Sequence, residues 1–170
     1  LPNDKNWILW SSTSQFPGGF FLFDPRNGQT SLIATAHSPT LKQSLFVAST
    51  PLSVASRSGG KIHGRVWLPA GIARPPLIVL SPASIPALPA SDAFNPLIQA
   101  LSANGLAVAV FDGRSTIGYG HDTDVLSSGS LAKVLQDDLE DGLAGLAAQG
   151  VVDGRRAGLT ECSTVVATGL

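Results

Sequence analysis

Two short, continuously apolar runs near the middle of the chain restrict its fold more than any other feature. They cover Leu77–Leu80 and Leu106–Phe111, and such runs are typical of strands that are buried on both faces of a sheet. Residues 92–103 and residues 130–149 carry apolar side chains at helical spacing. A last strand is expected at Ala157–Thr160. This alternation of strands and helices predicts an α/β fold with a doubly wound parallel sheet.

The amino-terminal part of the chain predicts β-structure without helices. Short strands are expected at Trp7–Ser11, Phe20–Phe23 and Thr30–Ala34, separated by turn-forming residues at 16–19 and 24–28. Strands of this length and spacing are typical of a sandwich or of a propeller blade. A single blade is not expected to be stable by itself, because each blade buries its faces against its neighbours.

Two further strands are expected before the first apolar run, at residues 47–56 and 61–68. In the second of them, apolar positions alternate with His63, Arg65 and Trp67. This alternation predicts a strand that is buried on one face only.

The composition excludes several classes of partner and leaves others open. A hydrophobic content of 44% is enough for a core, while a charged fraction of 14% and a net charge of −1 give no reason to expect nucleic acid or an anionic membrane. The apolar runs are too short to span a bilayer, and Asp4, Lys5 and Asn6 interrupt any signal-peptide pattern. A cytoplasmic location is therefore slightly favoured. The absence of methionine predicts an internal piece or a processed chain.

The last residues of the chain, Arg155–Leu170, have the outline of a nucleophile elbow. An expected strand leads into a small polar cluster around Ser163, and the run Thr164–Leu170 is compatible with a helix. In such an elbow, a sharp turn between strand and helix exposes a serine hydroxyl beside the N–H groups of the helix. Ser163 is therefore the candidate nucleophile.

The order of short motifs along the chain resembles that of the prolyl oligopeptidase family of serine peptidases, in its acylaminoacyl-peptidase and dipeptidyl-peptidase branch. Five stretches carry the resemblance: Ser56–Gly64 with Leu68-Pro69, Pro76–Leu80, Phe111–Gly120, Gln136–Asp138 and Val152–Arg156. No single stretch is specific, whereas their order and spacing together are.

The resemblance implies a domain organisation. Residues 1–50 would be the last blade or blades of a β-propeller, and residues 51–170 would be the amino-terminal half of an α/β-hydrolase domain that ends just after the elbow. It also implies acyl transfer on a peptide or acyl-peptide substrate, with no cofactor. Ser163 would be the nucleophile, and the backbone N–H groups of Thr164 and Ala83 would stabilise the oxyanion.

The catalytic motifs depart from the family pattern in three places. Glu161 and Val165 stand where the family has the two glycines of its G-x-S-x-G elbow, and a side chain there is expected to relax the strained turn. Pro82 in the oxyanion loop has no N–H to donate. The family's Asp and His follow the serine, and residues 164–170 contain neither. These departures predict an inactive chain.

The other chemically reactive side chains suggest structural roles. Cys162 is expected to be a small buried residue, His121 and His37 loop residues, and His63 a residue of the polar face of a strand. The acidic run at residues 137–141 is expected to be a solvated helix face with ion pairs. The histidines have no ligand-like spacing with acidic residues, so no metal is expected.

Two functions of different class therefore remain open. One is a piece of a serine peptidase or esterase that acts through Ser163. The other is a non-catalytic relative of the hydrolases, kept as an interaction module or as a decayed remnant, in which the substitutions around the site reflect lost chemistry.

Overall fold

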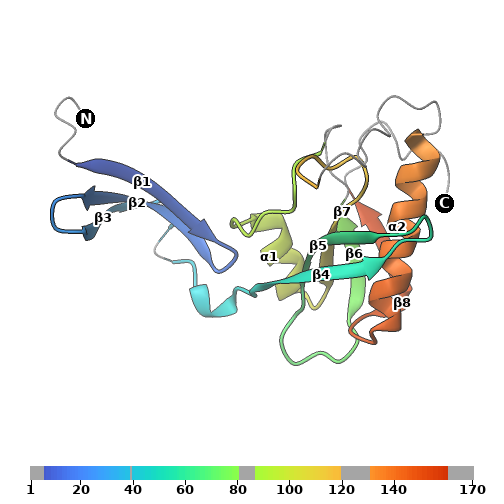
Figure 1. The fold of residues 1–170 in the computed structure, drawn as a ribbon. Helices are drawn as coiled ribbons and strands as arrows, with labels where there is room; N and C mark the ends of the chain where they lie inside the picture. The colour runs from blue at the N-terminus through green and yellow to red at the C-terminus, as the bar shows by residue number, and fades with distance from the viewer. Residues whose placement is uncertain (1–5, 39, 81–86, 120–130, 161–170) are drawn as a thin grey trace.

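The protein was analysed as a computed structural model, which describes residues 6–38, 40–80, 87–119 and 131–160. These residues form two β-sheets and two α-helices (Figure 1). Neither of the helices in these ranges has the length and hydrophobicity needed to cross a membrane.

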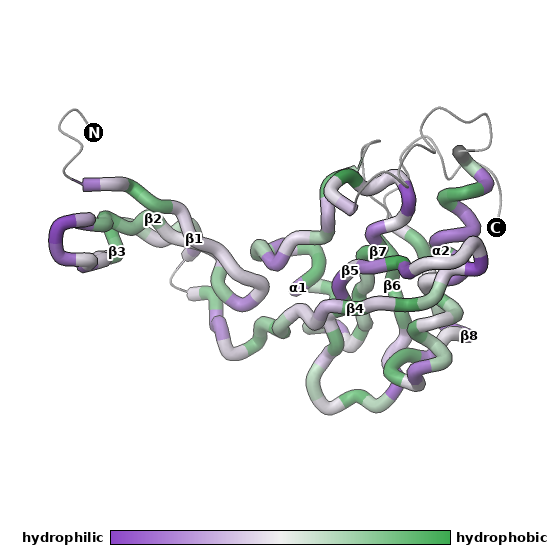
Figure 2. Tube along the Cα trace, viewed as in Figure 1, coloured by the Kyte–Doolittle hydropathy of each residue, from purple (hydrophilic) through white to green (hydrophobic). Residues whose placement is uncertain are grey.

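The amino-terminal sheet is antiparallel and has the order β1-β2-β3. Its strands are β1 (Trp7–Thr13), β2 (Phe16–Asp24) and β3 (Gln29–Thr35), which confirms the three expected strands in this part of the chain. Large apolar side chains remain exposed on it, among them Trp7 and Trp10, which are 52% and 51% exposed. Figure 2 shows hydrophobic stretches along the strands of this sheet.

The prediction of a turn at residues 16–19 is wrong. Residues 16–19 lie inside β2, and the chain reverses just before them. The pairing of β1 with β2 shifts between Ser11 and Thr13, and this irregularity lies opposite Pro17, which cannot donate a hydrogen bond to a regular ladder. The Ser12 hydroxyl also donates to the Phe16 carbonyl oxygen over 3.1 Å. The turn-forming residues therefore mark a bulge here.

The second sheet has five strands in the order β4-β5-β7-β6-β8. After the short 3-10 turn η1 (Gln43–Leu45), its elements follow along the chain as β4 (Ser49–Ala55), β5 (Lys61–Trp67), β6 (Pro76–Leu80), α1 (Pro96–Ala103), β7 (Ala107–Asp112), α2 (Leu131–Ala148) and β8 (Asp153–Thr160). Strand β6 is parallel to both β7 and β8, whereas β5 is antiparallel to β4 and to β7. The sheet is therefore mixed, and the expected parallel sheet is only its β7-β6-β8 part.

The two helices cover opposite faces of this sheet, as a doubly wound fold requires. On β6, Leu77 and Val79 belong to the core beneath α2, while Leu80 belongs to the core beneath α1. The apolar run that the sequence places here is therefore continuous because both faces of the strand are covered. Trp67 is buried in the core beneath α1, so β5 is not buried on one face only.

Each helix has a local reason for its position. Pro96 begins α1, and the Asn95 side chain caps it by accepting from the backbone N–H groups of Leu97 and Ile98. Helix α2 lies close to the sheet because glycines face it. A Cβ atom at Gly145 would lie 2.6 Å from the Val54 side chain, and one at Gly142 would lie 2.9 Å from the Phe111 ring.

Candidate functional site

The carboxyl ends of β6, β7 and β8 lie at one edge of the sheet, because these three strands run parallel. Ligand sites of open α/β sheets form at this edge, from the loops that follow the strands. Residues 81–86 follow β6, residues 113–119 follow β7, and residues 161–170 follow β8. This edge is the first candidate site.

The loops after β6 and β7 are joined by backbone hydrogen bonds. The Ala87 N–H donates to the Ser115 carbonyl oxygen over 3.0 Å, and the Ile117 N–H donates to the Ala87 carbonyl oxygen over 2.9 Å. Ala87 and Thr116 form an isolated parallel bridge, and both are 1% exposed. Residues 87–90 and 113–119, called the paired loops below, therefore form one ordered surface at the carboxyl edge.

The buried Asp112 carboxylate fastens both of the paired loops to the end of β7. Its Oδ1 accepts from the Ala90 N–H over 2.7 Å, and its Oδ2 accepts from the Tyr119 hydroxyl over 2.7 Å. The Tyr119 ring stacks on the His63 ring, with 5.1 Å between centroids and 2° between planes. Both carboxylate oxygens thus have a partner, as a buried carboxylate requires.

The same contacts determine the chemistry of Tyr119. Burial, the hydrogen bond to Asp112 and the Asp112 charge, in this order, raise the pKa of the Tyr119 phenol to about 12. At neutral pH the group is therefore a protonated hydrogen-bond donor and not a base.

A second buried carboxylate ties the loop after β7 to α2. Asp138 is 2% exposed, and its Oδ2 accepts from the Arg114 backbone N–H over 2.7 Å. Its Oδ1 accepts from the Arg114 Nε over 2.9 Å and lies 2.8 Å from the Arg114 Nη2. A two-point pair of this kind fixes direction as well as charge.

The rest of the acidic run on α2 pairs with one arginine of the β4–β5 turn. The Arg57 guanidinium contacts Asp137, Glu140 and Asp141 over 3.1, 2.9 and 2.7 Å. The Arg57 backbone N–H also donates to Asp141 over 2.7 Å, and this bond is the largest cause that lowers the pKa of the Asp141 carboxyl. The ion pairs expected for the run are therefore present, and two stretches that carry the family resemblance contact each other.

The predicted catalytic residues Ser163, Thr164 and Ala83 lie outside the described residues, as do Cys162 and His121. Their roles remain predictions. His63 is half-buried on β5 and stacks on Tyr119, and His37 lies after β3 with its ring edge-on to Phe16. Within the described ranges, no three His, Cys, Asp or Glu side chains gather as a metal site would need.

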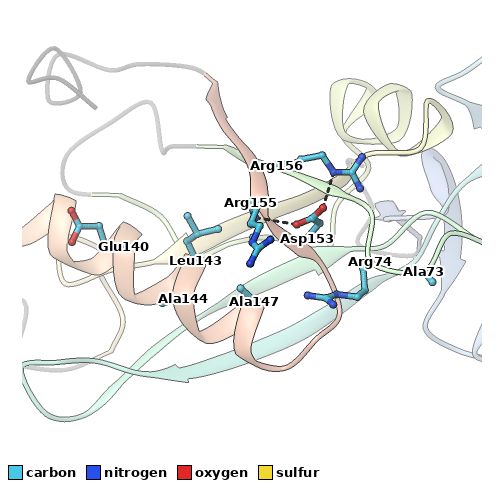
Figure 3. Close-up of a pocket in the computed structure, with 10 residues that line it drawn as sticks. Ala73, Arg74, Glu140, Leu143, Ala144, Ala147, Asp153, Arg155 and Arg156 are labelled. Atoms are coloured by element: carbon cyan, nitrogen blue, oxygen red, sulfur yellow. Dashed lines mark hydrogen bonds and ion pairs between the residues drawn. The ribbon is translucent and has the colours of Figure 1, made fainter.

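A second concave region lies away from the carboxyl edge. It is a pocket of about 850 Å³ between the segment before β6, the second half of α2 and the beginning of β8 (Figure 3). Three arginines line it, Arg74, Arg155 and Arg156, together with Asp153 and Glu140. Because it adjoins the amino ends of β6 and β8, it does not belong to the site that the paired loops border. We call it the arginine pocket.

Sequence reasoning missed the Asp112 contacts and the arginine pocket. No pattern of spacing predicts that Asp112 meets both Ala90 and Tyr119, because the contact depends on how two loops fold onto each other. The one sequence signal for the arginine pocket is the adjacent pair Arg155-Arg156, because two neighbouring arginines indicate a local concentration of positive charge.

Among the comparisons with known proteins, only the comparison of structures finds proteins similar to this chain. No family model matches the sequence, and no curated protein matches it. A search of solved structures finds puromycin hydrolase, with a TM-score of 0.76 and 16% identity over 91% of this chain and 24% of that chain. It also finds a puromycin-hydrolyzing peptidase of Mycobacterium tuberculosis, with a TM-score of 0.78 and 14% identity over 91% of this chain and 24% of that chain.

An acylaminoacyl peptidase of Pyrococcus horikoshii is similar to 95% of this chain, with a TM-score of 0.75 and 18% identity. This chain spans 24–26% of these three structures. All of these neighbours belong to the prolyl oligopeptidase family. The resemblance that the sequence motifs predicted is therefore confirmed at the level of the fold.

Proposed function

From the fold shared with prolyl oligopeptidase structures, we propose that this chain contributes part of an acyl-transfer site of the serine-peptidase type. Ser163 would be the nucleophile, and the backbone N–H groups of Thr164 and Ala83 would stabilise the oxyanion. The substrate would be a peptide or an acyl-peptide. The same proposal includes a domain organisation, with a propeller-like unit at residues 1–50 and half of a hydrolase domain at residues 51–170.

The observation that carries this proposal is the parallel arrangement of β6, β7 and β8. Ser163 follows the carboxyl end of β8 by three residues, and Ala83 follows the carboxyl end of β6 by three residues. These two strands are hydrogen-bonded neighbours that end at one edge, and this arrangement supports the proposal that the two residues share one site. The paired loops border this region.

Turnover requires a base that activates the serine hydroxyl. In a family-type triad the Asp and His follow the nucleophile, and residues 164–170 supply neither. The decisive assay is therefore reaction of a fluorophosphonate with the longest natural protein that contains this sequence. We expect labelling that Ser163→Ala abolishes, and a folded protein that is not labelled would contradict the proposal. The intact mass of the native protein, compared with 17.5 kDa, identifies the species to assay.

The second candidate function is a non-catalytic hydrolase relative that serves as an interaction module. Glu161, Val165 and Pro82 favour it, because each replaces a group that the elbow or the oxyanion site needs. Losing one oxyanion donor alone costs roughly 3 kcal/mol of transition-state stabilisation. Glycine at positions 161 and 165, with the H-G-G sequence at positions 82–84, should then create hydrolysis in the natural protein. Turnover by the unmodified protein that Ser163→Ala abolishes would exclude this function.

A further inference from the structure

Two arginines of the described residues stand apart from the others. Arg74 and Arg155 form no ion pair with any residue in the described ranges, although both line the arginine pocket. The other five arginines pair with carboxylates: Arg26, Arg57, Arg65, Arg114 and Arg156. The two guanidinium groups without a carboxylate partner in these ranges thus share one pocket.

The two carboxylates of the pocket lining are already engaged. Asp153 accepts from the Arg156 Nε over 2.7 Å and from the Arg155 backbone N–H over 3.1 Å. Glu140 accepts from Arg57 over 2.9 Å and from Gln136 over 3.1 Å. Neither carboxylate therefore forms an ion pair with the Arg74 or the Arg155 guanidinium, although the Arg74 charge is a minor cause that lowers the pKa of the Asp153 carboxyl.

The two guanidinium groups point into a common space. Figure 3 shows the ends of the Arg74 and Arg155 side chains directed toward each other beside Ala147 of α2. Like charges that face each other are unfavourable unless an anion lies between them. The planar guanidinium fork also matches the geometry of a carboxylate or phosphate group.

The backbone of Arg74 has a strained conformation. Its φ angle is 53°, and it is the one residue other than glycine with a positive φ among those that the structure describes. Side chains with a Cβ atom rarely adopt this conformation, and such residues cluster at binding sites. Glycine would adopt this φ angle without strain, so an arginine at this position carries a conformational cost.

Apolar side chains form most of the wall on the α2 side, beside Glu140. Leu143, Ala144 and Ala147 line the pocket there, and none of them offers a polar group that competes with the arginines. Pockets that combine an apolar wall with a few converging polar groups are typical of small-molecule sites.

We propose that the arginine pocket binds a small, doubly charged oxyanion, held between Arg74 and Arg155. A dicarboxylate and a phosphate share this chemistry. The proposal is independent of the function proposed for the carboxyl edge, since the pocket lies at the amino ends of β6 and β8.

The test is calorimetric titration of the 170-residue chain with inorganic phosphate and with glutarate, with ionic strength held constant by sodium chloride. We expect saturable binding with one site per chain. Arg74→Gly should weaken it at least about tenfold, because it removes one charge-assisted anchor. It should not lower the melting temperature, since glycine accepts the positive φ. Arg155→Ala should weaken binding by a similar factor.

The matched control is Arg26→Ala. Arg26 is an arginine in the turn after β2 that pairs with Asp24 over 2.7 Å, and its loss should change the affinity less than about twofold if binding is local. Tighter binding of phosphate would indicate a phosphate-bearing ligand, and tighter binding of glutarate an organic dicarboxylate. Either result supports the proposal. It is overturned if neither anion saturates, or if Arg74→Gly and Arg155→Ala bind as the unmodified chain or the Arg26→Ala control does.

Discussion

At the scale of single residues, buried carboxylates organise the carboxyl edge of the sheet. Asp112 accepts from a loop N–H and from a phenol, and Asp138 accepts from both the backbone and the guanidinium of Arg114. Removing one partner from such a buried group costs far more than breaking an exposed ion pair. These two side chains therefore hold the loops that border the proposed site.

Tyr119 provides a direct test of the Asp112 contact, because it is the single tyrosine of the chain. Titration of phenolate absorbance should therefore report this one group, with a midpoint near the pKa of about 12. Asp112→Asn removes the carboxylate charge, so the pKa midpoint should fall toward 10, the ordinary value of a tyrosine phenol. It should stay above that value because burial, the largest cause, remains.

The raised pKa of Tyr119 also fixes the direction of its effect on stability. The folded protein holds the phenol proton more tightly than the unfolded chain does. The contribution of Tyr119 is therefore complete below the unfolded value of 10 and disappears as the pH rises toward about 12. Tyr119→Phe is the control, since it should remove the absorbance change. A midpoint at 10 in the unmodified chain would contradict the Tyr119–Asp112 bond.

At the scale of elements, the sequence predicted most strands and both helices to within a few residues. Apolar runs and helical spacing identify β6, β7, α1 and α2, because burial on one or both faces of an element requires apolar residues at regular positions along the sequence. The position of β7 between β5 and β6 could not be predicted from such patterns, since the order of strands in a sheet depends on contacts between distant segments. The site itself was less predictable, because loop contacts such as Tyr119–Asp112 have no period.

The close packing of α2 against the sheet can be tested at Gly145. Replacing a helix glycine with alanine normally stabilises a protein by about 1 kcal/mol. Here the new Cβ would lie 2.6 Å from the Cβ and Cγ1 of Val54, a buried side chain that is branched and cannot swing away. Overpacking of this kind costs about 1–3 kcal/mol. We therefore expect Gly145→Ala to lower the free energy of unfolding in urea.

The control for this prediction is the same change in a Val54→Ala background. Val54→Ala removes Cγ1 and Cγ2 but keeps the Cβ atom, which would also lie 2.6 Å from the new methyl, so Gly145→Ala should be less harmful there but still destabilising. The difference between the two backgrounds measures the contribution of the two γ-methyl groups to the contact. If Gly145→Ala instead stabilises the unmodified chain by about 1 kcal/mol, helix propensity dominates and α2 has room to shift.

At the scale of the whole molecule, the amino-terminal sheet lies beside the α/β unit on the side of α1 (Figure 1). A group of buried hydrogen bonds, called the polar joint below, connects the two parts. Its centre is Gln99 of α1, which is 4% exposed. The Gln99 Nε2 donates to the carbonyl oxygens of Ser14 and Val47 over 2.7 and 3.0 Å, and its Oε1 accepts from the Val47 N–H over 2.9 Å. One side chain thus joins the β1–β2 turn, the connecting segment and α1.

This joint could not be predicted from the sequence, although its parts were. Gln99 occupies a position in an expected helix, and Ser14 lies between two expected strands, but 85 positions separate the two residues along the chain. Motif order predicted a β-rich part and an α/β part, and it carried no information on how the two parts meet. The structure shows a joint built from polar groups that are buried and paired, not from apolar contacts alone.

Gln99→Leu tests whether this amide holds the two parts together. Leucine has a similar size, but it leaves the Val47 N–H and the carbonyl oxygens of Ser14 and Val47 without these partners. Unpaired buried groups cost about 1–3 kcal/mol each, so we expect a loss of about 3 kcal/mol in the free energy of unfolding. Hydrogen exchange of the Val47 amide should accelerate, because the joint would open without unfolding of β6 and β7.

The matched control is Gln15→Ala, which removes an exposed glutamine that donates to the Phe46 carbonyl oxygen over 2.9 Å. Its loss should cost less than about 1 kcal/mol and leave Val47 exchange unchanged, because water can replace an exposed hydrogen bond. Unchanged Val47 exchange in Gln99→Leu would assign the joint to other contacts, such as the edge-on Phe46–Phe94 pair at 4.9 Å. Faster exchange in Gln99→Leu alone would show that the buried Gln99 amide holds the amino-terminal sheet against α1.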